Sequence, residues 1–450
     1  MQSARAASIF LAAVVLLALF AWMVAPGLGG TSDSAHYLAT ARHLRLGLGL
    51  VDVDGLPYRY WGPLFPTLLA VFYSPLWLRI LHGAALLGQL FLWSQMAGWL
   101  LPPARARWLP LLLALSTAVL VPAKFVWAET VFGLLAAGYF FGLLNWLRTE
   151  RSGWLVLATV LGFLLPLQRT SGVFLLAGAA VGLLATGAAR GRWGKLLWHG
   201  LACTAGFWAW NYYAEVLAGP PVYQALGNGP KLLATLADYG FVLLRWLVPL
   251  AVRWRAALPV LWALALPGLL LALWPRGRVH SLQETQSTHN LRLLWWVLLI
   301  NVAAHVAATN LARGAAGLHD TERYLAAVVA PVLLLVLAQW PAWSARHRAP
   351  WLGSALLAFW LLYSGVRVGH NANKLRATPL INWPQQARKV VRPGLSKAPR
   401  PAGRGSAGAS HAPSSPVAGG ALPVQFRPTA RGQTAARAGA GAAPRAEAIE

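Results

Sequence analysis

Long apolar runs separated by short basic segments follow one another along most of this chain. Residues 9–24, 154–167, 173–186 and 293–309 carry almost no charge, and such runs approach the length that a helix needs to cross a bilayer. The pattern predicts an all-α bundle of about eleven transmembrane helices. The expected spans lie near residues 8–26, 76–101, 108–122, 127–147, 153–167, 170–187, 196–213, 257–274, 293–310, 324–341 and 350–366.

The basic residues between the runs indicate how the bundle is oriented. Basic clusters occupy every second break, at 105–107, 148–151 and 190–195. Because cytoplasmic loops collect Lys and Arg, these breaks and the N-terminus are expected in the cytoplasm. The loop 27–75 then faces outward.

One apolar segment, 239–252, interrupts this count. It carries Arg245 in its middle, and a charge inside a bilayer is costly. We expect an interfacial or re-entrant helix here, which leaves the C-terminal tail on the outer side. If the segment spans instead, every later loop changes side.

Composition excludes a soluble protein, since 57% of the residues are hydrophobic, 11% are charged and the mean hydropathy is +0.53. The net charge of +26 is typical of nucleic-acid-binding proteins, but Lys and Arg lie between the spans or in the tail. Membrane topology explains the first group, so no nucleic-acid partner is expected. Cys203 is the single cysteine, which excludes an intrachain disulfide and a cysteine-based metal site.

We expect one membrane domain over residues 1–370, with outer loops at 27–75 and 214–256. Residues 371–450 form a basic tail. From about 397 the tail holds hardly any large apolar residue, so it is expected to be disordered. Electrostatic attraction to anionic lipid or polymer is an alternative role for it.

Acidic side chains are scarce, with 12 in the whole chain, and the most informative one is Asp33 in the first outer loop. Apolar residues at helical spacing over 37–50 predict a helix along the membrane surface. Ser32, Asp33 or Ser34 would serve as its N-cap, and capping is the alternative role for Asp33. The stretch 55–66 returns the chain to the membrane through three prolines and several aromatic residues, which would line a site for a ring-shaped polar headgroup.

Four motifs then occur in order. They are Asp33 with Tyr37 and a Gly-Pro-Leu-Phe-Pro re-entry, Trp127-Ala-Glu-Thr-Val-Phe132, Leu167-Gln-Arg-Thr-Ser-Gly172 and Thr321-Glu-Arg-Tyr-Leu325. This set resembles the GT-C glycosyltransferases that use polyprenyl-phosphate sugars, the superfamily of protein mannosyltransferases and aminoarabinose transferases. The resemblance covers about residues 8–366 and places all four motifs on the outer side.

The resemblance implies a role for each charged residue of the motifs. Asp33 would be the general base that takes the acceptor proton, and Glu129 would be a second carboxylate facing it. Arg169 and Arg323 would bind the donor phosphate, because guanidinium matches phosphate in geometry. The further substrate-binding candidates are Lys124, Tyr37, Arg59 and Glu322.

Each role has a structural alternative. Arg169 and Arg323 would otherwise anchor span ends at the headgroups. Glu129 would otherwise form a local ion pair with Lys124.

The first loop also differs from the sequence pattern of that superfamily at one position. Many relatives have Asp-Glu there, whereas this chain has Asp33 followed by Ser. The task of that Glu therefore passes to Glu129, Asp52 or Asp54, or is absent. A divalent cation at the carboxylates and a metal-binding role for His36 are left open, and no other cofactor is expected.

The resemblance thus predicts an inverting glycosyltransferase in the plasma membrane of a bacterium, active on the outer face. Its expected partners are a polyprenyl-phosphate-linked sugar, a lipid, glycan or protein acceptor, and the bilayer. A flippase or transporter of lipid-linked glycans is one alternative, although such proteins usually carry ionisable residues at mid-membrane. A surface-polysaccharide polymerase or ligase, with its site in 214–256, is another.

Overall fold

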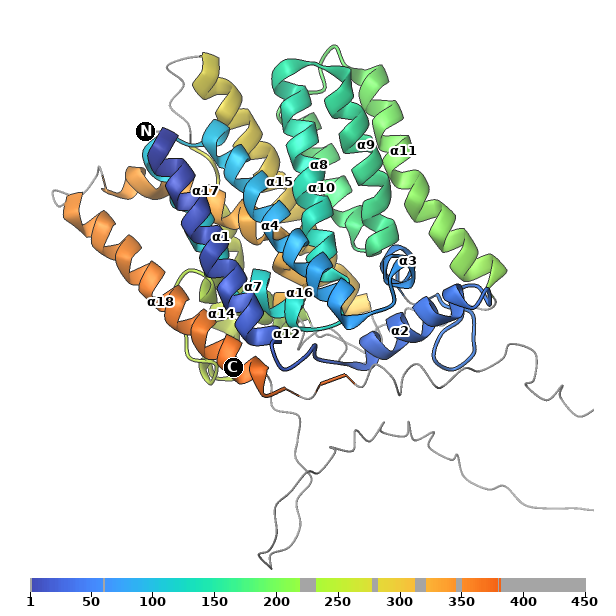
Figure 1. The fold of residues 1–450 in the computed structure, drawn as a ribbon. Coiled ribbons are helices and arrows are strands. Elements are labelled where there is room, and N and C mark those ends of the chain that lie inside the picture. Colours follow the sequence, from blue (N-terminus) through green and yellow to red (C-terminus); the bar gives the residue numbers. More distant parts are fainter. Residues whose placement is uncertain are drawn as a thin grey trace, which may run out of the picture.

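The computed structural model describes residues 2–59, 61–218, 232–276, 282–311, 321–344, 350–378 and 380–381. Over these residues the regular structure is helical, with isolated bridges but no strand. The helices pack side by side into a bundle with one large apolar core, and a smaller apolar cluster lies between two of them (Figure 1).

Six helical segments of the described chain are long and apolar enough to cross a bilayer. They are α1 (Gln2–Val24), α4 (Pro75–Leu100), α8 (Glu129–Thr149), α15 (Leu282–Leu311), α18 (Pro350–Arg376), and α16 (Thr321–Leu325) continued by η3 (Ala326–Val328) and α17 (Val329–Ser344).

A bent pair would make a seventh span, with an angle of 52° at the break. Its first half is α5 (Pro103–Ala106) with α6 (Leu109–Ala114), and its second half is α7 (Thr117–Leu120) with η1 (Val121–Lys124). Shorter apolar helices are α9 (Ser152–Gln168), α10 (Gly172–Ala185) and α14 (Pro259–Ala272). A helix therefore lies at each predicted run, but the number of eleven spans is not confirmed.

The remaining helices cover the bundle or its ends. They are α2 (Ser32–Arg45), α3 (Leu64–Val71), α11 (Trp193–Tyr212) with the π-helix η2 (Tyr213–Leu217), α12 (Leu232–Arg245) and α13 (Trp254–Ala257).

Helix α2 differs in its bounds from the helix predicted over 37–50. It begins earlier, with Thr31 as N-cap, and ends at Arg45 because Gly47 and Gly49 have positive φ values of 71° and 78°. The cap is therefore Thr31 and none of the residues predicted for that role, which were Ser32, Asp33 and Ser34. This frees the Asp33 side chain for a contact outside its own helix.

The two ends of the described chain lie at opposite ends of the bundle (Figure 1). The backbone N–H of Ile381 donates to the carbonyl of Leu28 at 3.0 Å, and Gly29 forms a bridge with Leu380. The chain that follows α18 therefore lies beside the first loop, as the count without a span at 239–252 requires. The tail from residue 382, including the part expected to be disordered, lies outside the described residues.

Helix α12 occupies part of the segment that interrupted the sequence count. It starts at Leu232 and ends at Arg245, so the prediction of one helix over 239–252 is wrong in its bounds. Fourteen helical residues extend about 21 Å, which is less than the hydrocarbon thickness of about 30 Å. That this segment is interfacial or re-entrant stays a prediction.

Close packing of α12 on α14 depends on Gly240. A Cβ added there would overlap the carbonyl oxygen of Trp262. The same helix also holds α16, because the Thr321 hydroxyl donates to the buried carboxylate of Asp238. Helix α12 therefore helps to position the segment that carries Arg323.

We expect Gly240→Ala to lower stability by about 1 to 3 kcal/mol, because the added methyl group forces the two backbones apart. Thermal unfolding of the purified protein measures this. Gly268→Ala is the matched control, since a Cβ there meets no atom within 4 Å. Equal melting temperatures for the two variants would contradict the packing argument.

Candidate active site at the ends of four helices

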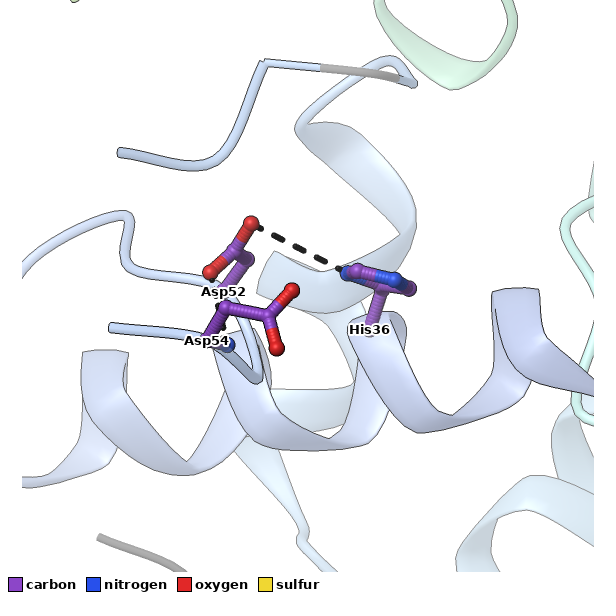
Figure 2. Close-up of side chains that lie close together, drawn as sticks. All are labelled: His36, Asp52 and Asp54. Carbon is purple, nitrogen blue, oxygen red and sulfur yellow. Dashed lines mark hydrogen bonds and ion pairs between the residues drawn. The ribbon is translucent and has the colours of Figure 1, made fainter. Parts of the chain in front are cut away.

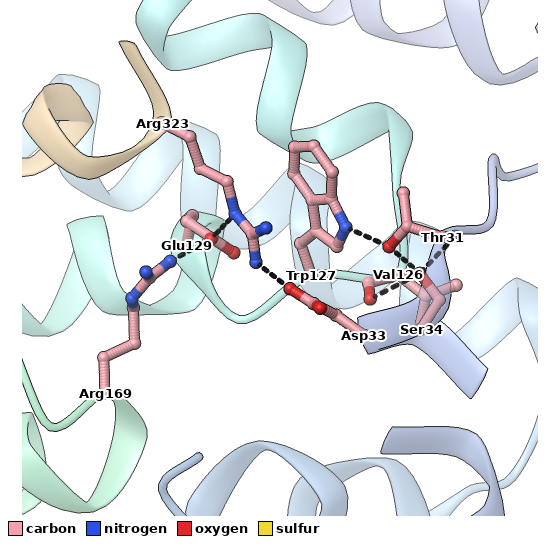
Figure 3. A network of polar contacts seen from close by, with 8 residues as sticks. All are labelled: Thr31, Asp33, Ser34, Val126, Trp127, Glu129, Arg169 and Arg323. Carbon is pink, nitrogen blue, oxygen red and sulfur yellow. Dashed lines mark hydrogen bonds and ion pairs between the residues drawn. The ribbon is translucent and has the colours of Figure 1, made fainter. Parts of the chain in front are cut away.

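The first turn of α2 is fastened to the segment that precedes α8. The Ser34 hydroxyl donates to the carbonyl of Val126 at 3.1 Å, and the Trp127 indole donates to the Thr31 hydroxyl at 2.8 Å (Figure 3). Thr31 in turn donates its backbone N–H to the Ser34 hydroxyl at 3.1 Å. These contacts fix the helical turn that carries Asp33.

Glu129 is the first residue of α8, and its side chain is 2% exposed. Arg169 lies in the turn between α9 and α10, and its Nη1 donates to the Oε1 oxygen of Glu129. The neighbouring Gln168 side chain donates to the carbonyl of Ala128 at 2.9 Å. The end of α9 is therefore joined to the start of α8 at two adjacent points.

Arg323 links the two carboxylates. Its Nε donates to the same oxygen of Glu129, and its Nη2 donates to Asp33 Oδ2 at 2.7 Å (Figure 3). The guanidinium also lies over the Trp127 ring, 4.1 Å from its centroid. Residues from the starts of α2 and α8, from the turn after α9 and from α16 thus form one ionic cluster, which we call the acid–arginine cluster: Asp33, Glu129, Arg169 and Arg323.

The four members differ in exposure. Asp33 is 17% exposed, compared with 12% for Arg169, 11% for Arg323 and 2% for Glu129. Only Asp33 combines a carboxylate with access to a reactant. Glu129 is better placed to hold the two arginines than to exchange protons.

Burial acts on the ionisable groups around this cluster. Burial, and then the nearby charge of Arg323, lower the pKa of Arg169 to about 10, so it remains cationic at neutral pH. Burial also raises the pKa of the Tyr37 hydroxyl, and the charges of Arg169, Asp33 and Arg323 all act on it. The Tyr37 hydroxyl therefore stays protonated beside the cluster.

Aromatic residues of the re-entry segment form one side of the site. The Tyr37 ring lies 5.0 Å from that of Phe65, edge to face, and 5.6 Å from that of Trp61. Gly62 allows this segment to approach α9, since a Cβ there would overlap the Leu167 carbonyl. The aromatic stretch is thus packed against the turn that carries Arg169.

Lys124 lies apart from the ion pairs of the cluster. Its Nζ donates to the carbonyls of Met23 at 3.0 Å and Gly27 at 2.9 Å, and the side chain is fully buried. It thereby satisfies carbonyls at the end of α1. The alternative pair between Lys124 and Glu129 does not form, because both arginines occupy that carboxylate.

Glu322 points away from its neighbour Arg323. Its carboxylate accepts from the Thr117 hydroxyl at 2.6 Å, from the Trp246 indole at 3.2 Å and from Arg367 at 3.0 Å. It therefore joins α16 to α7, to the residue that follows α12, and to α18. Its substrate-binding role stays a prediction.

Arg59 lies near the second outer loop, where its Nη1 approaches the Ala218 carbonyl at 3.5 Å. The rest of that loop, 219–231, is outside the described residues. The substrate-binding role of Arg59 stays a prediction.

A divalent cation between Asp33 and Glu129 does not fit the donor set. Two guanidinium groups lie on one Glu129 oxygen, and Arg323 also occupies Asp33. Their positive charge would repel a metal ion at the same oxygens. Asp52 and Asp54 do not replace the missing Glu of the first loop in this cluster, because they lie together with His36 (Figure 2).

Sequence reasoning assigned no role to three residues that the site uses. Trp127 covers Arg323, Thr31 caps α2, and Arg367 holds Glu322. Arg367 directly follows the predicted run 350–366, where a basic residue at a span end is ordinary, so the sequence did not mark it as a partner of Glu322. The partners of Trp127 and Thr31 depend on packing between distant segments.

No family model matches this sequence, and no curated protein matches it. Solved structures do match. Over 84% of this chain and 74% of the other, the structure is similar to ArnT from Cupriavidus metallidurans bound to undecaprenyl phosphate, with 15% identity and a TM-score of 0.50. The chain has the ArnT fold. The apo state of ArnT gives 14% identity and a TM-score of 0.48 over 84% and 73% of the two chains.

The match to ArnT confirms the predicted all-α fold of a polytopic membrane protein. At this level of identity the similarity concerns the fold. The activity has to be argued from the acid–arginine cluster itself.

Proposed function

We propose that this chain is a membrane glycosyltransferase that moves a sugar from a polyprenyl-phosphate carrier to an acceptor hydroxyl or amine. The acid–arginine cluster carries the proposal. It presents one partly exposed carboxylate, Asp33, beside two arginines that share a buried counter-charge. The solved structure with the same fold, ArnT, contains undecaprenyl phosphate.

In the proposed reaction the acceptor oxygen or nitrogen attacks the anomeric carbon of the donor sugar. Asp33 takes the acceptor proton as the new bond forms. The bond between the anomeric carbon and the phosphate oxygen breaks, and the lipid phosphate leaves with the electron pair. One displacement of this kind inverts the anomeric centre.

Arg169 and Arg323 would stabilise the departing phosphate. Each arginine carries five N–H donors in a planar group, and guanidinium forms paired hydrogen bonds with phosphate oxygens. A bound lipid phosphate would draw N–H groups of both arginines toward its oxygens. Glu129 keeps both guanidinium groups in place before the donor binds.

The distribution of basic residues supports an outer-face site. Arg5 donates to the Ser94 carbonyl at 2.7 Å, and Arg148 lies 4.2 Å from the Trp99 ring centroid, so both lie near the end of α4. That end of the bundle is opposite α2 and the acid–arginine cluster (Figure 1). Under the positive-inside rule, the basic end faces the cytoplasm of the plasma membrane and the cluster faces outward.

Purified protein in lipid vesicles, incubated with a panel of radiolabelled polyprenyl-phosphate sugars and candidate acceptors, tests the proposal. We expect release of free polyprenyl phosphate together with labelled acceptor for at least one donor. Movement of intact lipid-linked sugar across the vesicle, without release of lipid phosphate, would instead identify a flippase. Transfer that survives replacement of the cluster but is lost on changes in 214–256 would identify a polymerase or ligase.

A further inference from the structure

Three metal-ligating side chains meet in the first outer loop, outside the ion pairs of the acid–arginine cluster. One nitrogen of His36 and one carboxylate oxygen each of Asp52 and Asp54 all lie within 4.8 Å of one another (Figure 2). His36 comes from α2, whereas both acids come from the turn at 51–57 that follows it. The cluster therefore joins two segments of the first outer loop.

Asp52 is the buried member, with a side chain that is 1% exposed. Its Oδ1 accepts from the backbone N–H groups of Asp54 at 2.9 Å and Leu56 at 3.0 Å, which closes the turn. Its Oδ2 is buried and accepts no hydrogen bond from any described residue. A buried carboxylate oxygen without a partner is costly, so this atom is a candidate ligand for a bound ion.

Asp52 differs from the other buried acids in its ion pairs. Other buried acids of the described chain are paired with arginine: Glu129 with Arg169 and Arg323, and Asp238 with Arg255. Among the described ion pairs, Asp52 has only His36, whose Nδ1 lies 3.9 Å from Oδ2. That distance is too long for a hydrogen bond. Within the described part of a chain of net charge +26, the neighbouring carboxylates of Asp52 and Asp54 thus form no ion pair with arginine or lysine.

We propose that His36, Asp52 and Asp54 bind a divalent cation, and that Zn²⁺ is the ion that fits best. Zinc binds both imidazole nitrogen and carboxylate oxygen, the imidazole disfavours Mg²⁺ and Ca²⁺, and water would supply the fourth ligand. Zinc bonds of about 2.0 to 2.2 Å place the donors roughly 3.4 Å apart in a tetrahedral site. Asp54 is exposed and can turn inward to close the remaining gap.

The bound ion would hold α2 and the turn at 51–57 in a fixed relative position. His36 lies one turn after Asp33 on α2, and its ring packs 5.3 Å from that of Trp61. A cation held by His36 and the turn would fix α2 relative to the loop, and so the direction of Asp33. This positioning role is separate from the acid–arginine cluster and does not require the proposed transferase activity.

Isothermal titration of the full-length, chelator-treated protein in nanodiscs with ZnCl₂ tests the site. We expect saturable binding of one Zn²⁺ that raises the melting temperature. His36→Gln, Asp52→Asn and Asp54→Asn should each weaken the affinity about 10-fold or more and remove the thermal shift. Glu215→Gln is the matched control, because it removes an exposed carboxylate near the same end of the bundle and should leave binding unchanged.

Asp52→Asn and Asp54→Asn are expected to fold as the parent does, so a loss of Zn²⁺ binding in them would not result from unfolding. Asp52→Asn retains the Oδ1 acceptor that closes the turn, and the Asp54 side chain is exposed. The proposal is overturned if the parent protein shows no saturable Zn²⁺ binding, or if the three site variants bind Zn²⁺ as the parent does. Displacement of Zn²⁺ by an equal concentration of Mg²⁺ would overturn the choice of ion.

Discussion

Replacing Asp33 with Asn is expected to reduce sugar transfer about 100-fold or more while the protein stays folded. The amide keeps the size of the side chain but cannot accept the acceptor proton. Its ion pair with Arg323 is partly exposed, and Arg323 retains Glu129, so the loss of stability should be small. The measurement is the rate of release of lipid phosphate from a radiolabelled donor, with the melting temperature recorded in parallel.

Glu150→Gln is the control for this substitution. Glu150 pairs with Arg192 at the opposite end of the bundle, and its side chain is 66% exposed. The control should transfer sugar as the parent does. Full activity in Asp33→Asn would remove Asp33 as the base, whereas a fall in melting temperature matching the fall in rate would point to a structural role.

Replacing Glu129 with Gln is expected to cause a large loss of stability. The buried carboxylate is the shared counter-charge of Arg169 and Arg323, and the amide leaves both guanidinium groups without it. Breaking a buried ion pair by removing one partner typically costs about 3 to 5 kcal/mol. Thermal unfolding in nanodiscs should show a large fall in melting temperature and a lower yield of folded protein.

The same Glu150→Gln protein serves as the matched ion-pair control here, because its salt bridge is exposed. Exposed pairs contribute little, so its melting temperature should stay close to that of the parent. A Glu129→Gln protein as stable as this control would show that the two arginines do not depend on Glu129. Arg169 and Arg323 would then have to be neutralised by another group.

The two predictions also separate the roles of the two carboxylates. Asp33 should affect rate far more than stability, because it is the most exposed member of the acid–arginine cluster. Glu129 should affect stability first, because it is 2% exposed and holds two arginines. The sequence treated them as one pair of catalytic acids, and burial is what distinguishes them.

Several features of the fold follow from local sequence alone. Apolar runs predict helices because each backbone polar group must find its partner within the span. Arg245 interrupts the apolar segment 239–252, and α12 ends at that residue. The order of short motifs around Asp33, Glu129, Arg169 and Arg323 resembles the GT-C glycosyltransferases, and the structural match to ArnT at 15% identity agrees with the fold which that resemblance implies.

Other features depend on contacts between distant segments. The N-cap of α2 is Thr31, in a turn that is also tied to Val126 and Trp127 across the bundle. The partner of Glu129 is not the nearby Lys124, because that lysine is drawn to the open carbonyls at the end of α1. The distance along the sequence therefore does not predict which basic residue pairs with Glu129.

The sequence by itself determined that this is a helical membrane protein with its scarce acids and key arginines near span ends, since hydropathy and charge are properties of each residue. Only the tertiary structure decided which charges meet. Arg323 reaches both Asp33 and Glu129, and Asp52 turns toward His36 with one buried oxygen unpaired. These pairings depend on helix packing, which brings together residues that lie up to 290 positions apart in the chain.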